Sequence, residues 1–111
     1  MPAAVQHLLQ PLREATHAQR FVQLRYQDAQ GQHSQRRLRP LGCFYWGDVW
    51  TLAAWCESRQ AFRSFRLDRM ADVQVLEGPG GSFKQEAGKS LADYLRTAAP
   101  PGMGEKLAQG A

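Results

Sequence analysis

The chain has 111 residues, of which 43% are hydrophobic, and a formal net charge of +4. This length predicts one domain with a modest core, and the composition excludes a chain that is disordered throughout. No apolar run approaches the roughly 18 residues of a membrane span and no secretory signal opens the chain, so we expect a cytoplasmic protein.

The charge is distributed unevenly. Residues 13–69 carry ten arginines, no lysine and five acidic residues, whereas residues 70–111 have a net charge of −1. Arginine is the better side chain for planar, bidentate contact with phosphate or carboxylate groups. The asymmetry therefore indicates an acidic partner, and a compositional arginine bias of the genome is the competing explanation.

The first 18 residues predict one amphipathic helix. Pro11 either kinks this helix or marks the first turn of a shorter helix that begins near Gln10. The helix has no partner on its N-terminal side, so we expect a preceding domain outside this chain. Apolar residues recur at helical spacing at Val5, Leu8, Leu9, Leu12 and Ala15.

Six short strands are expected after this helix, at residues 21–26, 35–39, 42–46, 49–56, 62–67 and 71–76. Residues 28–31 predict the first turn, with Gly31 at the position that needs a positive φ, and Pro40 is expected to stop the second strand. Gly47-Asp48 predicts a two-residue hairpin turn.

That hairpin turn sets a register. It places Tyr45 opposite Trp50 and Cys43 opposite Leu52. Both faces of the hairpin are apolar, so the hairpin is either buried on both sides or keeps one aromatic face as a binding platform. In the strand at 62–67, alternation places Phe65 on one face with Arg63 and Leu67, and we expect Phe65 and Leu67 to be buried.

The fold class is therefore mainly β, a small SH3- or Sm-like antiparallel barrel with an N-terminal helix and a short C-terminal helix. The glycine-rich run at 78–82 is expected to end the packed region. Ser90 and Asp93 form a capping pattern that opens the last helix, which runs through Arg96. We expect a barrel domain at 1–83 and a C-terminal helix and tail at 84–111, with a frayed tail from Pro100.

Catalysis is not indicated. The three histidines are scattered, no glycine-rich phosphate loop follows a strand, and Cys43 and Cys56 lack metal-binding spacing. In the predicted register these cysteines do not oppose each other, so we interpret both as free thiols. We expect no enzyme activity, no metal and no cofactor.

The arginines suggest binding instead. Six of them fall on or near the predicted strands beside the aromatic hairpin. Arginine contacts phosphates and exposed aromatic rings stack on bases, which is the combination that single-stranded nucleic acid requires. The competing interpretation is that the tryptophans are core and the arginines cover the rim of the barrel. These six are Arg36, Arg37, Arg39, Arg63, Arg66 and Arg69.

Three segments together resemble the WYL domain, the C-terminal, Sm-like module of bacterial helix-turn-helix (DeoR-like) transcription regulators. They are residues 40–42 (Pro-Leu-Gly), 50–52 (Trp-Thr-Leu) and the long, specific run 63–70 (Arg-Ser-Phe-Arg-Leu-Asp-Arg-Met). The similarity extends upstream to 12–26 and downstream to 83–95. Thr51 occupies the position of the tyrosine in the Trp-Tyr-Leu motif that gives the family its name. This substitution removes a ring and a phenol from the implied site. Met70 replaces a usual Ile or Val.

The resemblance implies an effector-sensing domain that binds single-stranded DNA or RNA, or a nucleotide-like anion. It would signal to an N-terminal helix-turn-helix domain absent from this chain. The alternative is an interaction module that meets an acidic protein or forms a homodimer. A pocket flanked by Trp50 and Arg66 would favour a ligand, and a flat apolar patch rimmed by arginine would favour a protein partner. The resemblance implies site positions at Trp50, Thr51, Arg63, Arg66 and Arg69, and the strand pattern adds Arg37 and Arg39.

Overall fold

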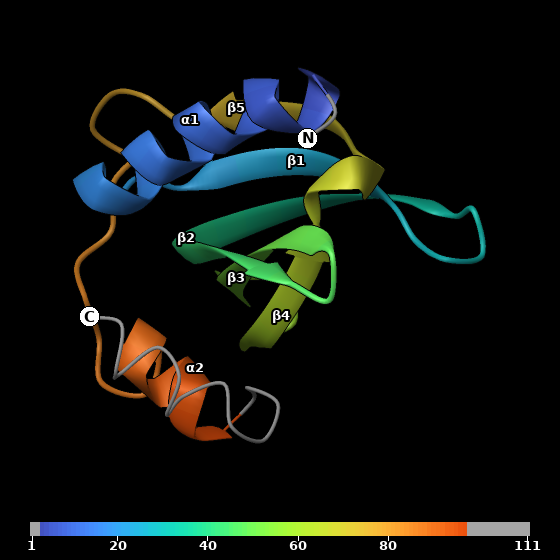
Figure 1. Ribbon diagram of the computed structural model, residues 1–111. Helices are drawn as coiled ribbons and strands as arrows, with labels where there is room; N and C mark the ends of the chain where they lie inside the picture. The colour runs from blue at the N-terminus through green and yellow to red at the C-terminus, as the bar shows by residue number, and fades with distance from the viewer. Residues whose placement is uncertain (1–2, 98–111) are drawn as a thin grey trace.

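The computed structural model describes residues 3–97 and places one antiparallel sheet of five strands between two helices (Figure 1). Helix α1 lies along β1 and β5, and α2 lies at the opposite end of the molecule, beyond β2 and β3. The elements are α1 (Ala3–Ala18), β1 (Val22–Gln27), β2 (His33–Trp46), β3 (Val49–Cys56), β4 (Ala61–Arg66), the 3-10 turn η1 (Leu67–Arg69), β5 (Met70–Val75) and α2 (Leu91–Thr97).

Helix α1 runs without interruption through Pro11. A helix that begins near Gln10 is therefore ruled out. Proline removes the hydrogen bond to the carbonyl of residue 7, but His7 lies on the exposed side of the helix, where water can replace the lost bond. The buried stripe compensates for the proline. It consists of Val5, Leu9, Leu12 and Ala15, all packed in the main core.

The prediction that Pro40 stops a strand is wrong. Residues 33–46 form the single strand β2, which pairs with β1 only as far as Leu38 and with β3 from Leu38 to Trp46. Pro40 thus lies where one edge of β2 has left β1, and a bulge between Pro40 and Gly42 shifts the register. Edges and bulges are the places where a sheet accommodates proline. The six expected strands are therefore five.

The predicted β2–β3 hairpin register is confirmed. Tyr45 pairs with Trp50, and Cys43 pairs with Leu52. Gly47 and Asp48 both have a positive φ, of 59° and 67°, as a type I′ turn requires. The turn at 28–31 is also confirmed, with Gly31 at a φ of 84°.

The predicted closed barrel is wrong. The strand order is β4-β3-β2-β1-β5, which leaves β4 and β5 as the two edges of an open sheet. The strand at 62–67 ends one residue early, because Leu67 opens η1, which leads directly into β5. Leu67 is only 1% exposed and shares a core cluster with the leucines of α1. Apolar side chains of α1 and η1 thus fill the space between the two edge strands, which pairing of β4 with β5 would close in a barrel.

The core forms on the sheet face that α1 covers. Phe65 and Leu67 are 3% and 1% exposed, so their predicted burial is confirmed. The side chains with almost no exposed area include Leu12, Val22, Leu24, Leu38 and Leu52. They come from α1 and three different strands, so the hydrophobic effect joins the helix to the sheet.

The glycine-rich run does not end the packed region. The Phe21 N–H donates to the carbonyl of Gly81 at 2.7 Å, and a side chain at Gly81 would collide with the carbonyl of Leu76. Beyond it the Phe83 ring packs on Phe21, and Tyr94 of α2 is 5% exposed. Phe83 and α2 therefore pack against the sheet beyond the glycine-rich run. The expected tail from residue 100 lies outside the described residues.

The C-terminal helix begins as predicted. The Asp93 N–H donates to Ser90 Oγ at 3.2 Å, and the Ser90 N–H donates back to Asp93 Oδ2 at 3.2 Å. This reciprocal pair is a capping box, with aspartate in the third position. The Tyr94 ring then packs edge-on against Phe62 of β4, which fixes α2 on the sheet face opposite α1.

Candidate functional site

The strand pattern separates the arginines onto two sides of the sheet. Side chains alternate along a strand, so Arg36 shares the α1 side with Leu38, whereas Arg37 and Arg39 point to the α2 side. In the same way Arg63 shares the side of Phe65, and Arg66 lies on the other. The seven predicted site residues are therefore not gathered in one cluster.

A pocket of about 380 Å³ lies on the α1 side, between the β1–β2 and β3–β4 turns. We call it the arginine pocket, after Arg36, Arg59 and Arg63. No described carboxylate forms an ion pair with any of these three guanidinium groups. The remaining lining residues are Tyr26, Asp28, Gln32, His33, Ser34, Ser64 and Phe65.

Asp28 is the one carboxylate among the residues that line the arginine pocket, and the turn already engages it. Its Oδ1 accepts the backbone N–H groups of Gln30 and Gln32, each at 2.9 Å. The only hydrogen bond from a pocket guanidinium to a described group is a long one, from Arg36 Nε to Ser34 Oγ at 3.3 Å. The pocket therefore has an excess of positive charge and donors that can bind an anion.

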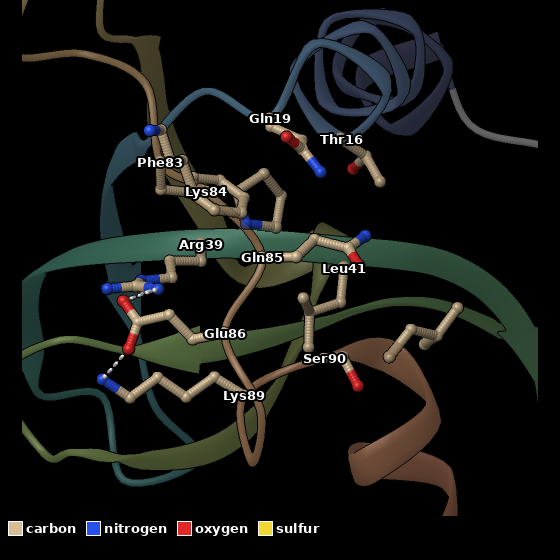
Figure 2. Close-up of a pocket in the computed structure, with 12 residues that line it drawn as sticks. Thr16, Gln19, Arg39, Leu41, Phe83, Lys84, Gln85, Glu86, Lys89 and Ser90 are labelled. Carbon is tan, nitrogen blue, oxygen red and sulfur yellow. Dashed lines mark hydrogen bonds and ion pairs between the residues drawn. The ribbon is translucent and has the colours of Figure 1, made fainter.

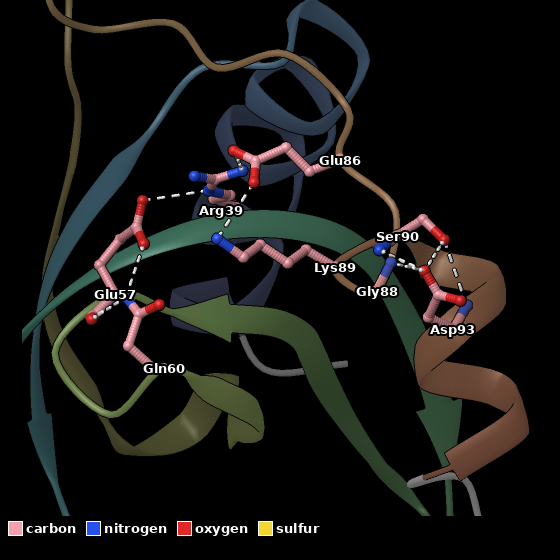
Figure 3. A network of polar contacts seen from close by, with 8 residues as sticks. All are labelled: Arg39, Glu57, Gln60, Glu86, Gly88, Lys89, Ser90 and Asp93. Atoms are coloured by element: carbon pink, nitrogen blue, oxygen red, sulfur yellow. Dashed lines mark hydrogen bonds and ion pairs between the residues drawn. The ribbon is translucent and has the colours of Figure 1, made fainter.

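Arg39 has the opposite surroundings. It is 9% exposed, its Nε donates to Glu57 at 3.0 Å and its terminal nitrogen donates to Glu86 at 2.9 Å (Figure 3). Lys89 lies 3.1 Å from the other oxygen of Glu86. We call these four residues the Arg39 network. Burial opposes the charge of Arg39, but the hydrogen bonds and charges of Glu86 and Glu57 outweigh it and raise the pKa of Arg39.

Three members of the Arg39 network, Arg39, Glu86 and Lys89, line a smaller pocket of about 150 Å³, between the end of α1 and the segment 83–91 (Figure 2). Glu86 stands between Arg39 and Lys89 in this view, so each cation already faces a carboxylate. A buried arginine paired twice holds segments together, and its charge is balanced. Here it joins β2 to the β3–β4 turn and to the chain that leads into α2.

The other predicted arginines are partly engaged. Arg37 donates to the carbonyl of Gly80 at 3.1 Å, and its guanidinium lies 4.3 Å from the centre of the Phe21 ring. Arg66 makes a two-point contact with Asp68, at 3.0 and 2.7 Å, which lowers the pKa of Asp68. Arg69 is half-buried in η1.

The aromatic hairpin contacts other side chains on both sides of the sheet. The guanidinium of Arg13 in α1 lies 5.5 Å from the Trp50 ring centre, and Tyr45 packs on Trp50 at 5.5 Å. On the α2 side, Trp55 packs on Phe62 at 5.1 Å beneath Lys89. The hairpin therefore fits neither expectation fully, because Trp50 and Trp55 are half-buried between neighbouring side chains whereas Tyr45 is 58% exposed.

Thr51 lies on the α2 side, paired with Arg66 of β4. Its hydroxyl makes a 3.4 Å hydrogen bond to the carbonyl of Phe44, its neighbour across the hairpin. Thr51 and Trp50 therefore face opposite sides of the sheet, as adjacent strand residues must. Trp50 and Thr51, two of the three residues of the segment 50–52, therefore do not share one surface.

Sequence reasoning left Arg59, Tyr26 and His33 out of the candidate site. Arg59 lies between the strands predicted at 49–56 and 62–67, and Tyr26 and His33 flank the first turn. The sequence pattern does not show which turns lie close together in space. Both turns join neighbouring strands of one sheet, so their ends can meet at the same pocket, but only the strand order shows that they do.

Both cysteines are free thiols, as predicted. Burial raises the pKa of Cys43 to about 11. Burial would also raise the pKa of Cys56, but the Ser58 hydroxyl, the backbone of Arg59 and the charge of Arg36 lower it overall. Among residues 3–97, no group of three or more His, Cys, Asp or Glu side chains could hold a metal ion.

The chain matches the model of the WYL domain over residues 7–75. The match spans more than half of the sequence, and the chain therefore belongs to the WYL-domain family. Neither helix in the described part of the chain is long and apolar enough to cross a membrane.

A solved structure with a similar fold is proteasome accessory factor B/C (PafBC) of Arthrobacter aurescens. The two share 20% sequence identity at a TM-score of 0.63. The alignment covers 90% of this chain but 14% of the PafBC chain. The likeness shows a shared fold, in which this chain corresponds to a small part of a longer protein.

Proposed function

We propose that this chain is the effector-sensing domain of a bacterial transcription regulator and binds single-stranded nucleic acid or a nucleotide-like anion. The observation that carries the proposal is the arginine pocket, in which Arg36, Arg59 and Arg63 have no described carboxylate partner. Membership of the WYL family supports the regulatory setting. The DNA-binding domain that would receive the signal lies outside this chain.

Charge pairing decides which of the predicted residues enter the proposed site. Of the predicted site residues the proposed site includes Arg63, and it adds Arg36 and Arg59. Arg39 stays outside because Glu57 and Glu86 balance its charge, and Arg37 stays outside because it contacts Phe21 and Gly80 on the opposite side of the sheet.

Arg66, Arg69 and Thr51 make a secondary surface in this proposal. Asp68 already occupies two donors of Arg66, so an incoming phosphate would have to compete with a carboxylate. Trp50 would have less ring surface free for stacking on a base, because Arg13 and Tyr45 already contact it. We therefore expect electrostatic contacts to contribute more to binding than base stacking.

Fluorescence anisotropy with a labelled single-stranded oligonucleotide tests the proposal. When a protein displaces counterions from Z phosphates of a single strand, the logarithm of the binding constant falls with the logarithm of the salt concentration at a slope of about −0.7Z. Three engaged arginines therefore predict a slope of roughly −2. Arg63→Gln should weaken binding and flatten the slope by about 0.7. The control is Arg25→Gln, since Arg25 is exposed on the opposite side of the sheet.

Absence of binding at low salt up to high micromolar concentration, with oligonucleotides and mononucleotides alike, would refute the proposal. A protein partner would then become the better explanation. That alternative has less support in the described part of the chain, where Tyr45 is the one large hydrophobic side chain that is exposed. A stable homodimer needs a much larger apolar area.

A further inference from the structure

We infer that the arginine pocket recognises a terminal phosphate, the monoester at the end of a nucleotide or oligonucleotide, in preference to the internal diester of a strand. The inference rests on the proposed function and specifies the ligand group that its site takes. It follows from the charge of the pocket, from its hydrogen-bond donors and from its position between two turns.

The charge of the arginine pocket exceeds what an internal diester carries. Three guanidinium groups line it against the single carboxylate of Asp28, and that carboxylate is held by two backbone N–H groups. An internal diester has one negative charge, whereas a phosphate monoester has about −1.5 to −2 at neutral pH and three free oxygens. The monoester therefore balances the pocket more completely.

Donors are available from several directions. Tyr26 Oη accepts the backbone N–H of Arg66 at 3.1 Å, and no described group accepts the proton of this hydroxyl. Ser34, Ser64 and His33 add polar groups to the lining. A guanidinium contacts phosphate through two parallel hydrogen bonds, so three arginines and a phenol can satisfy three oxygens at once.

The shape of the arginine pocket favours a chain end. Asp28 and Gln32 of the β1–β2 turn line one side, and Arg59 of the β3–β4 turn lines another. Phe65, which is 3% exposed and packs edge-on against Tyr26, is also in the lining. An internal phosphate must extend the strand in two directions, whereas a terminal phosphate extends it in one. A pocket between two turns on a buried ring therefore suits the end of a strand.

The test compares one short oligothymidine in three forms, with a 5′-phosphate, with a 3′-phosphate and with neither. Competition against a labelled strand is measured above the second pKa of phosphate, about 6. We expect at least one phosphorylated form to bind about tenfold more tightly than the unphosphorylated form, because charge-assisted hydrogen bonds are the strong ones. Thymidine monophosphate is a further competitor, which distinguishes a free nucleotide from a strand end. It should retain most of the tenfold advantage over the unphosphorylated strand.

The variants locate the effect. Arg63→Gln should reduce the ratio between phosphorylated and unphosphorylated strands toward one, and Arg25→Gln should leave the ratio unchanged. Circular dichroism confirms that both variants fold. Equal binding of all three strands would overturn the inference and leave the proposed function intact. No binding of any strand or of the mononucleotide would refute the proposed function as well.

Discussion

Arg39 and the three arginines of the arginine pocket lie on the strands and turns of one sheet but have opposite surroundings. Arg39 is 9% exposed and contacts two glutamates. Arg36, Arg59 and Arg63 line a pocket, and none of them forms an ion pair with a described carboxylate. A buried cation must be paired to be tolerated. An accessible cation without a partner can instead bind an anion from solution.

The difference teaches how to separate structural from functional arginines in a basic chain. Residue type and strand position are the same for Arg36, Arg37 and Arg39, which are neighbours on β2. What differs is the side of the sheet and the presence of a carboxylate. Each prediction below changes one of these two regions and asks whether stability or binding responds.

The largest effect is expected from the aromatic ring that lines the arginine pocket. Phe65→Ala should destabilise the protein by about 3–5 kcal/mol, the usual cost of truncating a buried Phe. Urea denaturation measures this loss. Phe83→Ala is the matched change beside the Arg39 network, and because Phe83 is only half-buried its loss should be clearly smaller. Equal free energies of unfolding for wild type and Phe65→Ala would contradict the assignment of Phe65 to the core.

The next effect separates the two arginine environments directly. Arg39→Met leaves Glu57 without its ion-pair partner and Glu86 with Lys89 alone. It should lower the free energy of unfolding by about 2–3 kcal/mol, less than for a fully buried pair because Glu86 is half-exposed. Arg63→Met should change it by no more than about 0.5 kcal/mol. Similar losses in the two variants would erase the distinction between paired and unpaired arginines.

The Arg39 network should also make stability depend on pH. The Arg39 hydrogen bond, followed by that of Lys89, lowers the pKa of Glu86 below its usual 4.5. A carboxyl group with a lowered folded-state pKa contributes stability above its unfolded pKa, and this is lost as the pH falls through the folded-state pKa. As the pH is lowered past about 4.5, the melting temperature should therefore decrease, and this decrease should be less steep in Glu86→Gln than in wild type. Glu77→Gln, an exposed control, should follow the wild-type profile.

The smallest effect concerns the thiols. Cys43 and Cys56 should titrate as two free thiols in the denatured protein without prior reduction. In the folded protein, Arg36→Gln should raise the pKa of Cys56 slightly, because the charge of Arg36 contributes to lowering it. The pH dependence of thiol alkylation measures this shift, with Arg37→Gln as control. Detection of no free thiol would indicate a disulfide and contradict the register of β2 and β3.

Local features of the fold were predictable from sequence. Gly47-Asp48 fixed the register of the β2–β3 hairpin, and the Ser90–Asp93 spacing located the start of α2. Alternation around Phe65 predicted its burial. In each case the decisive interaction joins residues that are close in the chain, so the pattern and the physical cause lie in one window.

The rest depended on distant pairing. Whether Pro40 ends a strand depends on where β1 stops pairing with β2, and closure of the barrel depends on how α1 and η1 fill the gap between the edges. The partners of Arg39 lie 18 and 47 residues away. Arg39 therefore looked like a binding residue, and Arg59 looked like part of a connection, until their neighbours in space were known.

Binding of single-stranded DNA by Arg36→Gln and Arg37→Gln tests the central claim most directly. The two residues are adjacent on β2, and each substitution removes one positive charge, but the side chains lie on opposite sides of the sheet. We predict that Arg36→Gln weakens binding by about tenfold and flattens the salt dependence by about 0.7, whereas Arg37→Gln changes both little. Equal losses in the two variants would show that binding follows net charge alone, and would contradict a built site at the arginine pocket.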